Sequence, residues 1–145
     1  MIYTPQTKKA LRVAFEAHKD QMDKSGLPYV FHPFHLAEQM KDEQTTAAAL
    51  LHDVVEDSEY TFADLEKMGF DKQVLDALAL LTHQPEVDYF DYVRKIRTNP
   101  IAAAVKKADL KHNSDLSRLN EVTQEDLERV EKYRKALQIL EGNEE

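Results

Sequence analysis

Four ionisable side chains interrupt an apolar stretch in the first half of this chain. The stretch reads LLHDVVEDS and places His52, Asp53, Glu56 and Asp57 among leucines and valines. If it is helical, His52 and Glu56 share one face and Asp53 and Asp57 share another, because residues four apart are neighbours on a helix. Asp53 also lies close to the apolar face, where a carboxylate needs a partner or a metal ion. An acidic, solvated helix end is the alternative interpretation.

Two other segments supply side chains of the same kinds. PYVFHP places His32 directly before a proline at a helix start, and VKKADLKHN places Asp109 inside an apolar helix, with Asn113 one turn later. With His52 and Asp53 they provide two imidazoles and two carboxylates. This ligand set suits a first-row divalent ion such as manganese or iron, with zinc as an alternative. On an ion that prefers six ligands, four protein ligands leave coordination positions open for water and substrate. A hydrolytic metal site has this arrangement.

Helices must bring these residues together, because the sequence is helical almost throughout. The residues that mark helix N-termini are Thr4-Pro5, Thr61 with Asp64, Asn99-Pro100, and Thr123 with Asp126. Periodicity predicts a final helix ending near Leu140, and helices over about residues 5–22, 33–40, 43–56, 72–81, 89–98 and 100–116. We therefore expect one all-α domain over residues 1–145, a bundle of six to eight helices.

Composition excludes several classes of function. The formal net charge of the 145 residues is −8, from 19 Lys and Arg against 27 Asp and Glu. This balance argues against binding nucleic acid or an anionic membrane by bulk attraction. The chain has no cysteine, which excludes disulfides, Cys-based zinc sites and Cys nucleophiles. The N-terminus lacks a signal-peptide core and the apolar runs are too short to cross a bilayer. We expect a soluble cytoplasmic protein.

Three motifs, in order, resemble the HD-domain phosphohydrolases, and specifically the hydrolase domain of the RelA/SpoT-type enzymes and the small alarmone hydrolases. The motifs are AHKDQMDKSGLPYVFHP, AALLHDVVEDSEYT and VKKADLKHNSDLSRL, and they extend over about residues 17–119. The resemblance implies an HD-domain helical fold that binds Mn²⁺. It also implies hydrolysis of the 3′-pyrophosphate of (p)ppGpp to GDP or GTP plus pyrophosphate, with this guanine nucleotide as the partner.

The resemblance assigns roles to residues by position. The metal ligands that it implies are His32, His52, Asp53 and Asp109. The catalytic pair falls on Glu56 and Asp57, and sequence alone does not separate their roles. The nucleotide contacts fall on Lys24, Ser25, Tyr29 and Asn113. For these contacts a structural interpretation stays open, because the first two could form a turn, the tyrosine could pack, and the asparagine could satisfy a backbone group.

One position departs from the family pattern. The residue before Lys24 is often basic in the family, usually arginine, and here it is Asp23. Arginine would stack on the base and attract phosphate, whereas aspartate does neither, so we expect weaker binding of the guanine nucleotide. Two alternatives therefore stay open: an HD phosphohydrolase that acts on another nucleotide, and a module that binds a nucleotide without hydrolysing it. The chain has no G-x-x-x-x-G-K loop, so we do not expect it to synthesise the alarmone.

Overall fold

The helix α3 (Glu43–Leu51) is central to the fold because its side chains are small or apolar. The computed structural model describes residues 1–143. Every residue of α3 from position 45 to position 51 is buried, including three consecutive alanines. Short side chains let neighbouring helices approach closely. The helices that contact α3 are α1 (Pro5–His18), α2 (Phe31–Glu38), α6 (Lys72–Leu81) and α8 (Pro100–Asn113).

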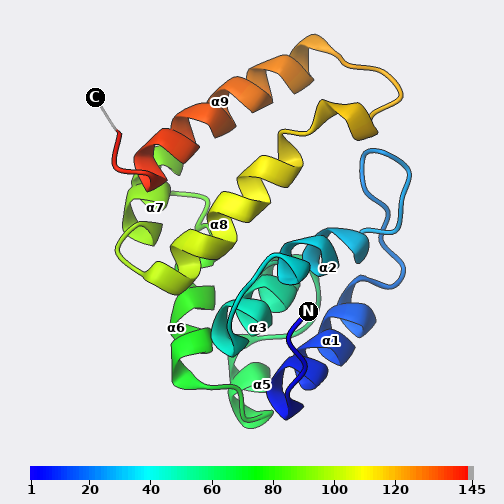
Figure 1. The fold of residues 1–145 in the computed structure, drawn as a ribbon, viewed down its shortest axis with the longest axis vertical. Coiled ribbons are helices and arrows are strands. Elements are labelled where there is room, and N and C mark those ends of the chain that lie inside the picture. The colour runs from blue at the N-terminus through cyan, green and yellow to red at the C-terminus, as the bar shows by residue number, and fades with distance from the viewer. Residues whose placement is uncertain (144–145) are drawn as a thin grey trace.

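The helix α8 lies between two groups of helices (Figure 1). On one side it contacts α2 and α3, and on the other it contacts α7 (Tyr89–Ile96) and the long C-terminal helix α9 (Gln124–Leu140). Three short helices complete the structure: α4 (Val54–Asp57), α5 (Phe62–Lys67) and the 3-10 helix η1 (Leu116–Arg118). Side chains on α8 can therefore meet residues from both ends of the chain.

The predicted all-α class is confirmed. The described residues form nine α-helices and one 3-10 helix, against the six to eight expected, and contain no strand beyond an isolated bridge between Met22 and Pro28. The predicted N-caps are present, since Thr4, Thr61 and Thr123 each accept a hydrogen bond from the backbone N–H three residues on. None of the helices in residues 1–143 has the length and apolarity needed to cross a bilayer.

The single helix predicted over residues 43–56 is wrong, because the chain breaks between α3 and α4. His52 Nδ1 lies 2.7 Å from the Ala49 carbonyl oxygen. In an uninterrupted helix that carbonyl would accept from the N–H of Asp53, four residues on. Asp53 instead has φ −109° and ψ 2°, outside the helical region. The break places His52 and Asp53 on a bend rather than on a regular helix face.

Other predicted boundaries were displaced by a few residues. α1 ends at position 18 rather than 22, because Gln21 has left the helix. The backbone carbonyl of Gln21 accepts from Tyr29 N at 2.8 Å, and its side-chain amide donates to Asp57 O at 2.7 Å. α2 begins at residue 31 rather than 33, so His32 lies inside its first turn. The predicted helices 89–98 and 100–116 end at residues 96 and 113.

Candidate metal centre and adjoining cavities

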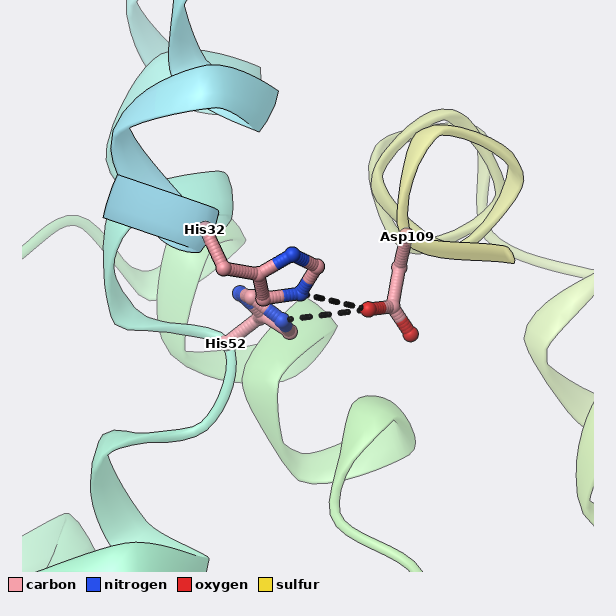
Figure 2. A group of neighbouring side chains, drawn as sticks. All are labelled: His32, His52 and Asp109. Atoms are coloured by element: carbon pink, nitrogen blue, oxygen red, sulfur yellow. Dashed lines mark hydrogen bonds and ion pairs between the residues drawn. The ribbon is translucent and has the colours of Figure 1, made fainter. Parts of the chain in front are cut away.

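Three of the four predicted metal ligands converge at one buried point (Figure 2). His32 from α2, His52 from the bend after α3 and Asp109 from α8 each offer one ligand atom, and these atoms all lie within 4.8 Å of one another. The Asp109 Oδ1 atom is 2.8 Å from His32 Nε2 and 3.5 Å from His52 Nε2. Ligand atoms bound to one ion at about 2.0–2.2 Å stand roughly 3 Å apart. The trio therefore fits a divalent metal ion.

The environment of His52 also fits a metal ligand. Because a carbonyl oxygen only accepts, the contact with Ala49 places a proton on Nδ1. The buried Nε2 atom has no aligned hydrogen-bond partner, although Asp53 Oδ2 lies 2.9 Å away. Burial alone would lower the pKa of His52, but Asp53 and Asp109 outweigh it and raise this pKa well above its ordinary value. The site thus attracts positive charge, either a proton or a metal cation.

The neighbouring His112 sets the orientation of His32. The two Nδ1 atoms are 2.7 Å apart and the two rings stack at 4.9 Å. Burial, with added repulsion from His32 and Arg118, lowers the pKa of His112 to about 4, so this ring is neutral at neutral pH and accepts the His32 proton. His32 Nε2 then faces Asp109 Oδ1 at 2.8 Å, where it would donate a proton to the carboxylate or, with a metal ion between the two atoms, offer its lone pair to the ion. Metal-bound histidines are held in this manner by the partner of their other nitrogen.

Asp109 is surrounded by donors. Its Oδ1 atom accepts from Asn113 Nδ2 at 2.9 Å, in addition to the His32 contact, and its Oδ2 atom lies 3.0 Å from Lys106 Nζ. Burial alone would raise the pKa of Asp109, but Lys106 and the two histidines hold it well below its ordinary value. The side chain of Lys106 is only 13% exposed. The sequence predicts that Lys106, Lys107 and Lys111 solvate a helix and does not decide whether one of them faces the anion. The position of Lys106 three residues before Asp109 puts both on one helix face.

Asp53, the fourth predicted ligand, lies beside the trio rather than in it. Its Oδ2 atom faces His52 Nε2 and accepts a hydrogen bond from the Tyr29 hydroxyl. The place of Asp53 among the ligands stays a prediction.

A cavity of about 170 Å³ opens beside the metal trio. Its lining includes His52, Asp109, Lys106 and the predicted catalytic residue Glu56. Glu56 Oε1 accepts from the His83 backbone N–H at 2.6 Å. Partial burial raises the pKa of Glu56 above its ordinary value and Asp53 adds to the effect, although the His83 N–H opposes it. Partial burial, reinforced by Asp53, also raises the pKa of Asp57, but Asp57 does not line this cavity.

A second cavity of about 300 Å³ adjoins the trio on the side of His32. All four predicted nucleotide contacts line it: Lys24, Ser25, Tyr29 and Asn113. Sequence reasoning missed the residues that η1 and α9 add, among them Arg118, Leu119, Arg129 and Tyr133. The spacing of Arg129 and Tyr133 places them one turn apart on the final helix, but it does not show that this helix lies beside residues 22–29.

No protein-family model matches the chain. The bifunctional (p)ppGpp synthase/hydrolase SpoT of Escherichia coli strain K12 is 45% identical over 71 residues, covering 46% of this chain and 10% of that protein. A GTP pyrophosphokinase of Streptomyces coelicolor is 34% identical over 148 aligned positions, covering 94% of this chain and 17% of that protein. The chain therefore spans a small part of the length of these curated relatives.

A solved structure shares the fold over almost its whole length. It is that of a metazoan ortholog of SpoT, described as hydrolysing ppGpp and as having a role in starvation responses, and it matches with a TM-score of 0.76. The two sequences are 27% identical, and the match covers 99% of this chain and 90% of that chain. The resemblance to the RelA/SpoT hydrolase type is confirmed.

The carboxylate of Asp23 is bound within its own loop. Its Oδ1 atom accepts from the Ser25 backbone N–H at 2.8 Å, the Ser25 hydroxyl at 2.6 Å and the Leu27 N–H at 3.0 Å. Its Oδ2 atom lies 3.4 Å from Arg118 Nη1. Burial alone would raise the pKa of Asp23, but these contacts hold it below its ordinary value. Asp23 is therefore not an isolated charge, because it binds its own loop and pairs with a cation. The weaker binding of the guanine nucleotide expected from it stays a prediction.

Proposed function

We propose that this HD domain hydrolyses the 3′-pyrophosphate of (p)ppGpp to GDP or GTP and pyrophosphate, with Mn²⁺ as its metal ion. The observation that carries the proposal is the convergence of His32, His52 and Asp109 between two cavities, one with an acidic side chain and one with the predicted nucleotide contacts. The fold shared with a ppGpp hydrolase supports it. A diffusible guanine nucleotide as partner and a cytoplasmic location belong to the same proposal.

The products define which bond must break. Because pyrophosphate leaves intact, water adds its oxygen to the phosphorus atom next to the ribose 3′ oxygen, and the bond between these two atoms breaks. The 3′ oxygen takes up a proton and becomes a hydroxyl group. A divalent ion, when bound, offsets the negative charge of the pyrophosphate and lowers the pKa of a water molecule.

The protein groups beside the trio can complete this reaction. Glu56 lines the cavity with His52 and Asp109, so its carboxylate can orient the attacking water and accept its proton. The raised pKa of Glu56 makes it a stronger base than an ordinary glutamate. Lys106 lines the same cavity and stays protonated, since Asp109 and the nearby tyrosines outweigh its burial and raise its pKa. We assign Asp57 a smaller part in activating the water, because it does not line the 170 Å³ cavity.

A nucleotide panel tests the proposal. The protein is incubated with Mn²⁺, Mg²⁺ or Zn²⁺ and with ppGpp, pppGpp, GTP, ATP or deoxynucleoside monophosphates, and released phosphate and pyrophosphate are measured separately. We expect pyrophosphate from ppGpp and pppGpp, fastest with Mn²⁺. Release of phosphate from another nucleotide alone would favour the general HD phosphohydrolase. Binding of ppGpp by calorimetry without any release would favour the non-catalytic module.

A further inference from the structure

Arg118 is held in place at the edge of the 300 Å³ cavity. It belongs to η1, 95 residues after Asp23, yet its Nη1 atom lies 3.4 Å from Asp23 Oδ2. Its Nη2 atom donates to the His112 carbonyl oxygen at 3.1 Å. The partner Asp23 is itself fixed by the hydrogen bonds of its loop. The guanidinium is therefore oriented before any ligand binds, so that little side-chain entropy is lost on binding.

The hydrogen-bonding capacity of Arg118 is not exhausted by these contacts. A guanidinium has five N–H donors, and only the two contacts with Asp23 and His112 use them. The Nε atom is buried and has no hydrogen-bond partner among residues 1–143, and the side chain as a whole is 27% exposed. An unsatisfied buried donor carries a free-energy cost that a bound acceptor can relieve. Arg118 therefore lines the cavity as a partly unsatisfied cation.

Other cations line the cavity together with Arg118. Lys24 and Arg129 also line it, and Arg129 is oriented in a similar way by Asp126, at 2.9 Å. The three cations Lys24, Arg118 and Arg129 stand against two lining aspartates, Asp23 and Asp115, in a chain with a formal net charge of −8. The metal trio adjoins the cavity at the His32 side, where the scissile pyrophosphate must lie. The phosphates that remain for the cations are those on the 5′ oxygen of the nucleoside.

We propose that Arg118 is a specificity-determining residue that binds the 5′-phosphates of the nucleotide, with Asp23 as the residue that positions it. The inference rests on the proposed function, because it takes the 3′-pyrophosphate to lie at the metal trio. According to this inference, Asp23 strengthens nucleotide binding by positioning Arg118, rather than weakening it by repelling the phosphates. Replacing Asp23 by arginine would remove the partner of Arg118, break the hydrogen bonds of the loop, and raise KM rather than lower it.

The test compares two substrates that share the scissile group. One is ppGpp, and the other is guanosine 3′-pyrophosphate, which lacks both 5′-phosphates. The wild-type protein should have a KM for ppGpp lower by about tenfold or more, as expected for a charge-assisted contact. In Arg118→Gln this difference should nearly vanish through a higher KM for ppGpp, with kcat little changed because the contact acts on substrate and transition state alike. Arg118→Lys keeps the positive charge but loses the planar pair of N–H donors. This variant should retain part of the difference in KM between the two substrates.

The matched control is Arg134→Gln. Arg134 is also an ion-paired arginine, bound to Glu131, but its side chain is 54% exposed and lies outside this cavity. This variant should keep the wild-type ratio of the two KM values. Equal increases in KM for both substrates in Arg118→Gln would place the side chain at the base and overturn the 5′-phosphate assignment. KM values that stay at the wild-type level for both substrates would overturn any contact, whereas a wild-type protein inactive on ppGpp would contradict the proposed function itself.

Discussion

The metal centre and the nucleotide cavity are built in different ways. In the metal centre, His32, His52 and Asp109 are buried, and each is held by further hydrogen bonds from the surrounding helices. In the nucleotide cavity, the lining includes a loop, the short helix η1 and one face of α9, and its two arginines pair with Asp23 and Asp126. The buried cluster is suited to chemistry that requires fixed geometry, and the more exposed cavity is suited to recognition.

The difference predicts that substitutions in the two regions affect different kinetic constants. Changes in the metal centre should alter metal affinity and kcat, because they act on the groups at the reacting bond. Changes in the cavity should alter KM, because they act on parts of the nucleotide that do not react. The following variants test this separation, from the largest expected effect to the smallest.

The largest effect should come from His52→Ala. Loss of one of the three convergent ligands should abolish both Mn²⁺ binding and pyrophosphate release. In the wild-type protein, Mn²⁺ at a hundredfold excess over its Kd should raise the unfolding free energy by about 2.7 kcal/mol, and a chelator should reverse this. In His52→Ala the ion should not change the melting temperature. Lys8→Ala, which removes an exposed side chain on α1, is the control and should keep the metal-dependent shift.

Glu56→Gln should separate chemistry from metal binding. Loss of the proton acceptor should lower kcat by a factor on the order of a hundred or more, while Mn²⁺ affinity measured by calorimetry stays near the wild-type value. Asp57→Asn should lower kcat less, since Asp57 lies outside the cavity lining. Glu59→Gln, an exposed change three residues along, serves as the control. Loss of the ion in Glu56→Gln would make Glu56 a ligand and merge the two roles.

Asn113→Ala tests the boundary between the two regions. Asn113 lines the nucleotide cavity, but its amide also donates to Asp109 Oδ1. If its main role is to orient the ligand, Mn²⁺ affinity or activity should fall by about tenfold to a hundredfold, as for other residues that support metal ligands. A higher KM with unchanged Mn²⁺ affinity would assign Asn113 to nucleotide recognition instead. Calorimetry with Mn²⁺ and steady-state kinetics with ppGpp distinguish the two results.

The smallest effect should come from Gly26→Ala in the loop that carries Lys24. Gly26 has φ +83° with open space around the position of a Cβ atom, so the cost is conformational, about 1–2 kcal/mol. Gly142→Ala is the matched control, because Gly142 has φ +78° and equally open surroundings. Both variants should lose similar stability in chemical denaturation, but only Gly26→Ala should raise KM for ppGpp. Equal KM values would show that the loop does not contact the nucleotide.

The amino-acid sequence by itself determined the helical class, the N-caps and the kinds of side chain at the metal centre. Thr61 and Thr123 cap the helices that follow them because a capping box is a contact between residues three apart. Likewise, the residue types of His32, His52 and Asp109 defined a ligand set before their distances were known. These features depend on local contacts or on chemistry alone, and both are present in the order of residues.

Tertiary structure alone decided the bend at His52, the burial of Lys106 and the composition of the nucleotide cavity. At the bend, the His52 side chain donates a hydrogen bond to the Ala49 carbonyl oxygen. This bond competes with the helical hydrogen bond from the backbone to the same carbonyl, which is of similar strength. The pairing of Asp23 with Arg118 joins residues 95 positions apart and requires α8, η1 and the loop before α2 to pack together. The sequence pattern specifies which face of each helix is apolar, but the crossing angles and the neighbours of each helix follow from how the helices pack together.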